Sequence, residues 1–275
     1  MEGSGVLARA GTVGILGAGH LGRALAHALL AAGLPQGRLL LAHGGSAVTA
    51  ARLAREGLSP CVVDAATLAS LADTVLLTLR PQQAGALRGL PWRAGARVLS
   101  CMAGVPAQAL AALTDRAVVR VMPSAPDTLA AGRAVAGLWP HDEFANDLLA
   151  AVGVEVHPLE REDDLNAFTA AVCLPAALAQ GGDGPEAPAA LQTLAGGQSL
   201  FAALYPWARA ALPPTVGERE RFVAAMATPG GVTEAIVTAQ RGGASLGEAL
   251  LAGVARSREL GAAIGRLLAE DGTEL

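Results

Sequence analysis

Residues 12–32, TVGILGAGHLGRALAHALLAA, decide the fold class of this chain of 275 residues. The apolar run Thr12–Leu16 is typical of a buried strand, and the amphipathic run after residue 20 is typical of a helix. Between them lies a strand-to-helix turn with the pattern G-x-G-x-x-G. In such a turn Gly17 permits the tight bend, Gly19 permits close approach of a pyrophosphate, and Gly22 permits close packing. We therefore expect a phosphate-binding turn here. The alternative is a glycine turn that binds no nucleotide.

The same alternation of strand and helix continues to about residue 158. Further apolar runs, each a predicted strand, are residues 39–42, 61–63, 74–79, 97–101, 117–122, 135–138 and 154–157. Amphipathic runs between them predict helices, so residues 1–158 are expected to form a Rossmann-type, doubly wound parallel α/β sheet. After that point the strand patterns stop, and residues 159–275 are predicted to form an all-α domain.

Composition excludes several classes of protein. Hydrophobic residues make up 52% and charged residues 16% of the chain, which excludes a disordered protein, and the net charge of -4 argues against a nucleic-acid binder. All 20 basic residues are arginines, so a Schiff-base lysine and a P-loop lysine are absent. No long uncharged run predicts a membrane helix, the start lacks a targeting pattern, and no His or Cys spacing predicts a metal site. We expect a cytoplasmic protein.

The end of the second predicted strand indicates which dinucleotide binds. An NAD site usually has an acidic residue there, but residues 41–46 are LAHGGS. Without an acid, a 2′-phosphate meets no repulsion, and His43, Ser46 and Arg52 are available to contact it. NADP(H) is therefore preferred, with NAD(H) possible. In the alternative interpretation, His43 and Ser46 are ordinary loop residues.

Several motifs then fall in an order that resembles the pyrroline-5-carboxylate reductase family. Four segments and the tail carry this resemblance: VGILGAG at 13–19, LRPQ at 79–82, VLSCMAG at 98–104 with VRVMP at 119–123, ATPGGVT at 227–233, and ARSREL at 255–260. The resemblance covers nearly the whole chain, and the Pro-Gly-Gly segment is its most specific piece.

The chain also departs from that family. A Gly-rich stretch of the family, SGSGPAY, is matched here by AVCLPAA at residues 171–177. Val172 and Leu174 replace glycines, so the wall beside the substrate is expected to be narrower or reshaped. Ser124 stands where the family has an asparagine. The fold and the cofactor site are therefore expected to carry over better than the identity of the substrate.

The resemblance implies NADPH-dependent reduction of a cyclic imine, 1-pyrroline-5-carboxylate to L-proline, by a homodimer or an assembly of dimers formed through the helical domain. The implied cofactor-binding residues are Gly17, Gly19, His20, Leu21, Gly22, His43, Ser46, Leu79, Arg80, Pro81, Ala103 and Gly104. The implied substrate-binding residues are Thr228, Gly230, Gly231, Val232 and Thr233. Thr233 is also the expected catalytic residue, with its hydroxyl on the imine nitrogen.

From the residues alone, the Pro-Gly-Gly turn is either an anion-binding nest for a substrate carboxylate, or a plain turn with Thr233 as a helix cap. Cys101, near the expected cofactor edge, is expected to be a packed thiol. Two other functions remain open: a related reductase with a different imine or a carbonyl substrate, and a non-catalytic NADP-binding paralogue.

Overall fold

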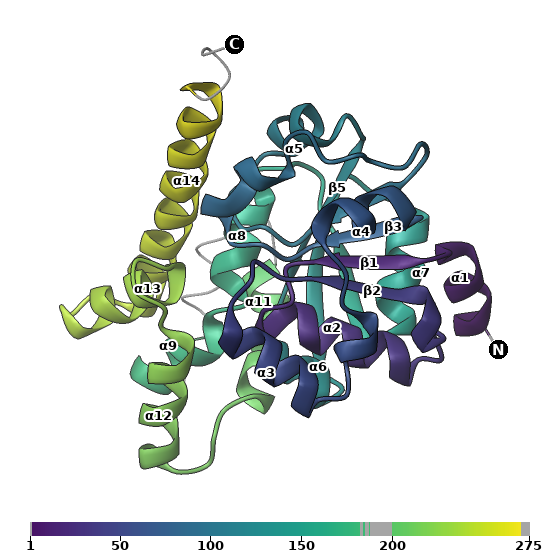
Figure 1. The fold of residues 1–275 in the computed structure, drawn as a ribbon. Helices are drawn as coiled ribbons and strands as arrows, with labels where there is room; N and C mark the ends of the chain where they lie inside the picture. Colours follow the sequence, from purple (N-terminus) through teal and green to yellow (C-terminus); the bar gives the residue numbers. More distant parts are fainter. Residues whose placement is uncertain (1, 182–183, 185–186, 188–199, 271–275) are drawn as a thin grey trace. The chain divides into compact units, whose positions relative to one another are not determined.

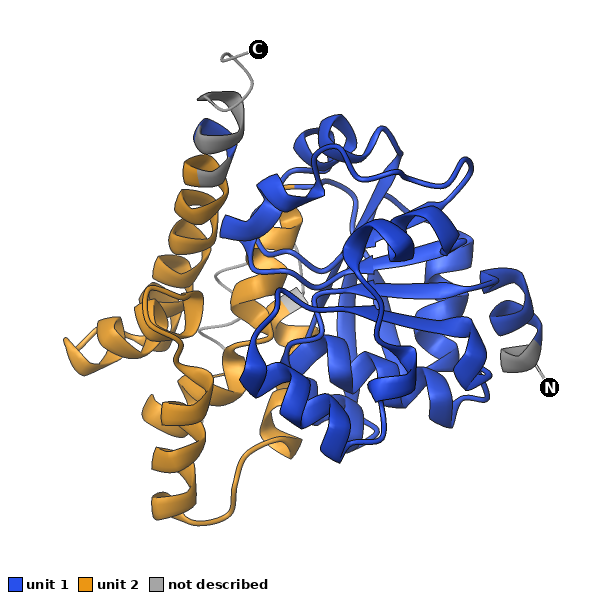
Figure 2. Ribbon diagram, viewed as in Figure 1, with its two compact units in different colours: residues 1–162, 264–275 blue, residues 163–263 orange. Residues whose placement is uncertain are grey.

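The computed structural model describes residues 2–181, 184, 187 and 200–270. Its contacts divide the chain into two compact units (Figure 2). The first comprises the described residues of 1–162 and 264–270, and the second those of 163–263. The change from mixed α/β to helical structure therefore falls a few residues after the predicted position.

The first unit contains a seven-stranded sheet in the order β2-β1-β3-β4-β5-β6-β7 (Figure 1). The strands β1 to β5 run parallel, β6 is antiparallel to β5, and β7 is parallel to β6. The strand bounds are β1 Val13–Leu16, β2 Leu39–Ala42, β3 Thr74–Leu77, β4 Arg97–Ser100, β5 Val118–Pro123, β6 Ala134–Trp139 and β7 Val154–Pro158. The chain order reverses direction between β1 and β3, which makes this the doubly wound sheet that the sequence predicts.

Side chains alternate between the two faces of the sheet along each strand, and here the side chains on both faces are apolar. Helices therefore cover both faces. Ile15 and Leu76 belong to one buried cluster, together with residues of α1, α2, α3 and α7. Leu16 and Leu77 belong to a second cluster, together with residues of α4, η3 and α5. The helices of this unit are α1 Glu2–Ala10, α2 His20–Ala31, α3 Ala47–Arg55, α4 Ala65–Leu71, α5 Ala107–Thr114, α6 Pro126–Ala130 and α7 Glu143–Ala151, with the 3-10 turns η1 Gln36–Arg38, η2 Ser59–Cys61 and η3 Pro81–Leu87.

One predicted strand is wrong. Residues 61–63 do not join the sheet as a strand, since Cys61 ends the turn η2 and Val62 forms only an isolated bridge with Leu41. Pro60 lies inside η2 and favours the tight turn, because its ring fixes φ near the helical value. Of this apolar run Cys61 is buried and Val62 and Val63 are half-buried, and the amide of Val63 makes a single hydrogen bond to the carbonyl of Leu41 at 2.9 Å.

The second unit is helical throughout its described part. Its helices are α8 Asp164–Ala171, α9 Leu174–Gly181, α11 Leu200–Ala210, α12 Val216–Met226, α13 Val232–Arg241 and α14 Leu246–Glu270, whose residues 264–270 are grouped with the first unit. The helix α9 packs against α11, α12 and α13. On α14, Gly253 allows a close approach to α13, because a Cβ there would lie 2.7 Å from the Ile236 side chain. Residues 181–188, GGDGPEAP, are rich in turn formers and are predicted from sequence to be a loop, but they lie mostly outside the described residues.

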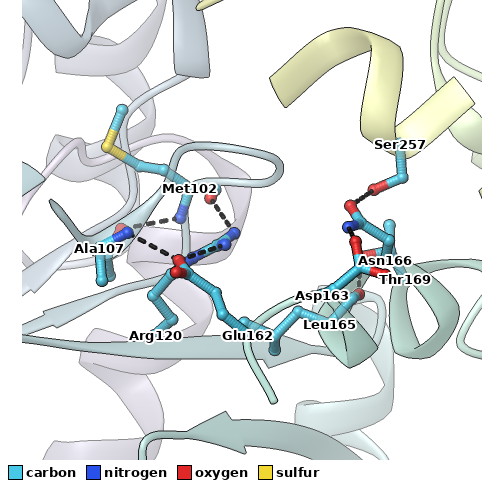
Figure 3. Close-up of polar contacts among 10 residues, drawn as sticks. Met102, Ala107, Arg120, Glu162, Asp163, Leu165, Asn166, Thr169 and Ser257 are labelled. Atoms are coloured by element: carbon cyan, nitrogen blue, oxygen red, sulfur yellow. Dashed lines mark hydrogen bonds and ion pairs between the residues drawn. The ribbon is translucent and has the colours of Figure 1, made fainter. Parts of the chain in front are cut away.

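Glu162, where the first segment of the first unit ends, is held by a partly buried ion pair (Figure 3). Arg120 on β5 donates from Nη1 to the Glu162 carboxylate at 3.0 Å, and the backbone amide of Ala107 donates to the same oxygen at 2.7 Å. Burial lowers the pKa of Arg120, and the hydrogen bond and charge of Glu162 oppose that shift. The carboxylate thus joins β5 to the start of α5.

The first residue of the second unit, Asp163, is held by different partners. Arg258 on α14 donates to the Asp163 carboxylate at 2.6 Å. Asn166 donates to Asp163 at 2.9 Å and accepts a hydrogen bond from Ser257 at 2.8 Å, as the right side of Figure 3 shows for Asn166 and Ser257. These bonds fasten the start of α8 to α14 within the second unit.

We predict that Glu162→Ala destabilises the first unit, because it leaves the guanidinium of Arg120 buried without an anion. The side chain of Arg120 is 7% exposed and that of Glu162 is 28% exposed, so the expected loss is about 1–3 kcal/mol. Urea unfolding measures this loss, with the exposed Glu160→Ala as a matched control. Equal stability of the two variants would contradict the prediction.

Candidate functional site

The predicted cofactor residues lie in four loops at one edge of the sheet. Leu16, Ala42, Leu77 and Ser100 end neighbouring parallel strands in register, so the loops that follow them start at the same edge. Ligands of doubly wound folds bind at this edge, outside the point where the strand order reverses. The structure therefore brings together the residues that the sequence selected in the first unit, and their role as ligands stays a prediction.

The glycine turn is held by hydrogen bonds from both neighbouring strands. The amides of Gly17 and Ala18 donate to the carbonyl of Ala42, at the end of β2, at 2.9 and 3.1 Å. The hydroxyl of Thr78, just after β3, donates to the carbonyl of Gly17 at 2.6 Å. Sequence analysis missed Thr78. A hydroxyl residue directly after the third strand is the signal that marks it.

The three glycines of the turn differ in what a side chain would meet. At Gly17, where φ is 116°, a Cβ would lie 2.6 Å from the Thr78 carbonyl carbon. At Gly22 a Cβ would collide with the carbonyl oxygen of Gly17. At Gly19, which is exposed and has a φ of -73°, a Cβ would meet no atom within 4 Å. Thus Gly17 and Gly22 are needed for packing, whereas Gly19 leaves space above the start of α2.

The N-terminus of α2 faces this space without an acidic neighbour in its own first turn. The first amides of a helix lack partners within the helix and attract anions. His20, at the start of α2, is exposed, and its Nε2 lies 3.3 Å from the Asp127 carboxylate. Leu21 is half-buried. A backbone contact of this turn with phosphate therefore remains the expected role of both residues.

The loop after β2 contains no carboxylate. His43 is half-buried, and its Nδ1 accepts a hydrogen bond from the amide of Gly45 at 3.2 Å. Ser46 is exposed and caps α3 by accepting a hydrogen bond from the Thr49 amide at 3.4 Å. Arg52 is exposed on the same helix. The nearest acid along α3, Glu56, is paired with Arg23 and His27.

Glu56 is held in its charged form by these two partners. Partial burial raises its pKa, but the hydrogen bonds of His27 and Arg23 outweigh this effect, so the net shift is downward. Its carboxylate is therefore committed to α2 and does not fill the place of the acid that would hold a ribose at the end of β2.

The loops after β3 and β4 complete the edge. Leu79 and Pro81 are half-buried and Arg80 is exposed, while Ala103 and Gly104 are half-buried. Burial raises the pKa of the Cys101 thiol to about 12, so this thiol is neutral, as a packed thiol should be. Within the described residues, no group of three potential ligands could hold a metal ion, and no helix is long and apolar enough to cross a membrane.

In the second unit, the Pro-Gly-Gly segment forms a tight turn before α13. The amide of Gly231 donates to the Thr228 carbonyl at 2.9 Å, and Gly230 has a φ of 70°. Such a turn needs a residue with positive φ after a proline. The amide of Gly230 donates to the carboxylate of Glu234 at 2.7 Å. Both glycine amides are therefore occupied by groups of the chain itself, which the prediction of a free anion nest did not anticipate.

Arg256, within the ARSREL segment, holds the same turn from α14. Its Nε donates to the carbonyl of Gly230 at 2.9 Å, and its Nη1 donates to Glu259 at 3.0 Å. Sequence analysis missed both Glu234 and Arg256 as partners of the turn. An acidic residue three positions after the glycine that caps a helix is a known capping signal, so Glu234 could have been found.

Thr233 lies in the first turn of α13, with only 7% of its surface exposed. The cap of that helix is Gly231, so the predicted alternative that Thr233 is the helix cap is wrong, whereas the plain turn itself stays an alternative to an anion nest. Its hydroxyl donates to the sulfur of Cys173 at 3.2 Å. Val232 is buried beside it, and Thr228 is exposed. Val172 and Leu174, which flank Cys173, are both buried.

The fold and the loops at its carboxyl edge define a Rossmann-type α/β unit with an open glycine turn, followed by a helical unit. Residues 12–104 match the family model described as NADP oxidoreductase, coenzyme F420-dependent. Among curated protein sequences, none matches this chain significantly.

Solved structures of three reductases are similar in fold. A pyrroline-5-carboxylate reductase from Coxiella burnetii is 22% identical with a TM-score of 0.55, over 91% of this chain and 98% of that one. A pyrroline carboxylate reductase from Plasmodium falciparum, solved with NADP bound, is 18% identical with a TM-score of 0.57, over 91% and 98%. The 1-pyrroline-5-carboxylate reductase from Streptococcus pyogenes is 20% identical with a TM-score of 0.56, over 90% and 98%. At these identities the similarity establishes the fold.

The glycines of the turn give a prediction about stability. Gly17→Ala forces a side chain into a left-handed φ and against the Thr78 backbone, so it should cost about 1–3 kcal/mol. Gly19→Ala enters open space at a φ that alanine adopts readily, so its unfolding free energy should stay within about 0.5 kcal/mol of wild type. Urea denaturation of the two variants side by side tests this. A loss at position 19 as large as that at position 17 would refute it.

Proposed function

We propose that the protein is an NADP(H)-dependent reductase of the C=N bond in a small cyclic imine, of the pyrroline-5-carboxylate reductase type. The observation that carries this proposal is the geometry of the glycine turn. A side chain at Gly17 or Gly22 would collide with backbone, whereas a side chain at Gly19 would meet no atom of the chain within 4 Å. The similar fold of three such reductases and the NADP oxidoreductase model over residues 12–104 support it. The cytoplasmic location that the sequence pattern predicts and the homodimer that the resemblance implies belong to the same proposal.

The residues of the first unit fit a dinucleotide. A side chain at position 19 would occupy the space through which a ligand reaches the start of α2. Gly19 has no side chain, so this space is empty. The first amides of α2 would hold the pyrophosphate, as helix N-termini do in this fold. The loop residues Leu79–Pro81 and Ala103–Gly104 would line the same edge. When bound, NADPH supplies the hydride for the reduction.

The loop after β2 favours NADP(H) over NAD(H). It offers His43 and Ser46 without a carboxylate, and Arg52 follows on α3. The absence of an acid removes repulsion against a 2′-phosphate, and the guanidinium of Arg52 adds a charge that suits it.

In the second unit, Thr233 is proposed to contact the nitrogen of the substrate. A protonated imine is already a strong electrophile, so the protein needs to orient it more than to activate it. A hydroxyl at the nitrogen fixes that orientation without adding a charge. Thr233 is itself only 7% exposed, and its chain neighbour Val232 and its partner Cys173 are buried, so little water reaches the hydroxyl.

NADPH oxidation tests the proposal directly. We expect wild-type protein to oxidise NADPH with 1-pyrroline-5-carboxylate or with another cyclic imine from a panel of larger and decarboxylated rings. Gly19→Ala, which should fold normally, is expected to weaken NADPH binding at least about tenfold, because a methyl group then occupies the approach to the pyrophosphate. Absorbance of the nicotinamide and direct titration give the two readouts. Binding of NADPH without turnover of any imine would instead identify a non-catalytic NADP-binding protein.

A second candidate substrate is an imine that lacks a carboxylate. Glu234 favours it, because its own carboxylate already occupies the Gly230 amide at 2.7 Å. A substrate carboxylate at this turn would have to displace Glu234 and would be repelled by its charge. An uncharged substituent meets neither obstacle.

Glu234→Ala should therefore change substrate preference. We expect it to lower KM for 1-pyrroline-5-carboxylate about threefold or more, because it frees the Gly230 amide and removes a like charge, and to leave KM for 1-pyrroline unchanged. Steady-state kinetics on both imines measure the effect. Glu218→Ala is the matched control, since Glu218 caps α12 in the same unit. An equal change in KM for both imines would show that Glu234 does not discriminate against the substrate carboxylate.

A further inference from the structure

Thr233 belongs to a buried chain of hydrogen bonds that runs from α13 to α8. Its hydroxyl donates to the sulfur of Cys173 at 3.2 Å, and that sulfur donates to the carbonyl of Thr169 at 3.2 Å. The Thr169 hydroxyl is not part of this chain and donates separately to the carbonyl of Leu165 at 2.7 Å. Thr233, Cys173 and Thr169 are each 7% exposed. All four residues lie in the second unit, so the chain is complete within one compact body.

The carbonyl of Thr169 determines which group donates in each hydrogen bond of this chain. A carbonyl can only accept a hydrogen bond, so the contact between Cys173 and Thr169 uses the single proton of the thiol. The carbonyl of Thr169 is available for it, because the backbone amide of Cys173 donates to Ala170 instead. With its proton committed, the sulfur can only accept from Thr233. The hydroxyl proton of Thr233 must therefore point at Cys173.

The thiol keeps its proton at neutral pH, so this arrangement is the resting one. Burial raises the pKa of Cys173 to about 11, and the hydrogen bond from Thr233 opposes that shift. A thiolate would leave the Thr169 carbonyl without a donor, while its sulfur would still accept the hydroxyl proton of Thr233.

We propose that Cys173 is a positioning residue that turns Thr233 into a pure hydrogen-bond acceptor, and that the substrate is therefore a protonated imine and not a ketone or aldehyde. This inference rests on the proposed function and deepens it. The N–H of a protonated imine donates to the free lone pairs of Thr233. A carbonyl oxygen has no proton to offer and needs a donor, which Thr233 cannot be while Cys173 holds its proton.

The electron balance of the two reactions agrees with this distinction. When a protonated C=N bond receives hydride at carbon, its π electrons become the nitrogen lone pair, and the N–H bond is retained throughout. No proton has to be delivered by the protein. When a C=O bond receives hydride, the oxygen becomes an alkoxide that must gain a proton, and the chain from Thr233 to Thr169 ends at a carbonyl that has none to supply.

The first test compares Cys173→Ala with Cys173→Ser. We expect Cys173→Ala to lower kcat for the best imine about tenfold, with KM for NADPH unchanged, because the hydroxyl of Thr233 is then free to rotate. The ratio of imine to ketone turnover should fall by a similar factor, because Thr233 becomes able to donate. Cys173→Ser restores a group that accepts and donates, and should stay within about twofold of wild type. Cys61→Ala, which removes a buried thiol of the first unit, is the matched control.

A second measurement tests the hydrogen bond between Thr233 and Cys173 without measuring catalysis. In a Cys61→Ser, Cys101→Ser background, Cys173 is the only thiol, and its titration is followed by the ultraviolet absorbance of the thiolate. Thr233→Val should raise the pKa of Cys173, because the thiolate loses its hydroxyl donor.

The outcomes separate this inference from the proposed function. A wild-type protein that reduces no imine overturns both. An active enzyme overturns the Cys173 assignment alone if Cys173→Ala keeps the imine-to-ketone ratio, if Cys173→Ser fails as badly as Cys173→Ala, or if Thr233→Val leaves the thiol titration unchanged. Loss in Cys173→Ala with rescue in Cys173→Ser, together with a raised thiol pKa in Thr233→Val, supports it.

Discussion

The contact of the β1–α2 turn with the residue after β3 is the constraint on which the first unit depends. Backbone meets backbone there, since Gly17 lies against Thr78 and Gly22 lies against the carbonyl of Gly17. The hydroxyl of Thr78 closes the turn by donating to that carbonyl. Because the turn is fixed from two strands, the start of α2 keeps a constant position relative to the sheet edge. The space left at Gly19 then follows from the backbone of the turn and from the missing side chain at this position.

The fold class could be predicted from the sequence, because the two periodicities that indicate it, one of strands and one of helices, are local. Strands of about four buried residues and helices of two to three turns were visible as apolar runs and amphipathic runs. The error at residues 61–63 shows the limit of this reasoning. A short apolar run is buried equally well in a strand or in a packed turn, and only the neighbouring strands decide which one forms. The helix α1 was not predicted either, because its first residues carry no clear apolar face.

The candidate site was less predictable, because its contacts join residues that are far apart in the chain. The glycine turn is a contiguous motif, and the loops after β2, β3 and β4 followed from topology. The partners of the second turn did not follow. Nothing local indicates that Arg256 holds Gly230, or that Cys173 lies beside Thr233. Glu234 is a different case: its spacing from Gly231 predicts a cap, yet an acid beside a proposed anion nest was at odds with the expected ligand, and the structure shows the carboxylate of the chain itself in that place.

The adjacent carboxylates Glu162 and Asp163 have one more consequence. Glu162 is fastened to Arg120 and Ala107 in the first unit, and Asp163 is fastened to Arg258 and Asn166 in the second. The chain therefore passes from one unit to the other without a slack residue at this point. A protease needs several residues of extended, yielding backbone to enter its cleft. At this crossing both carboxylates are anchored, each in its own unit, so the backbone is restrained against local opening while they keep their partners; the other crossing, at residues 263 and 264, lies within α14.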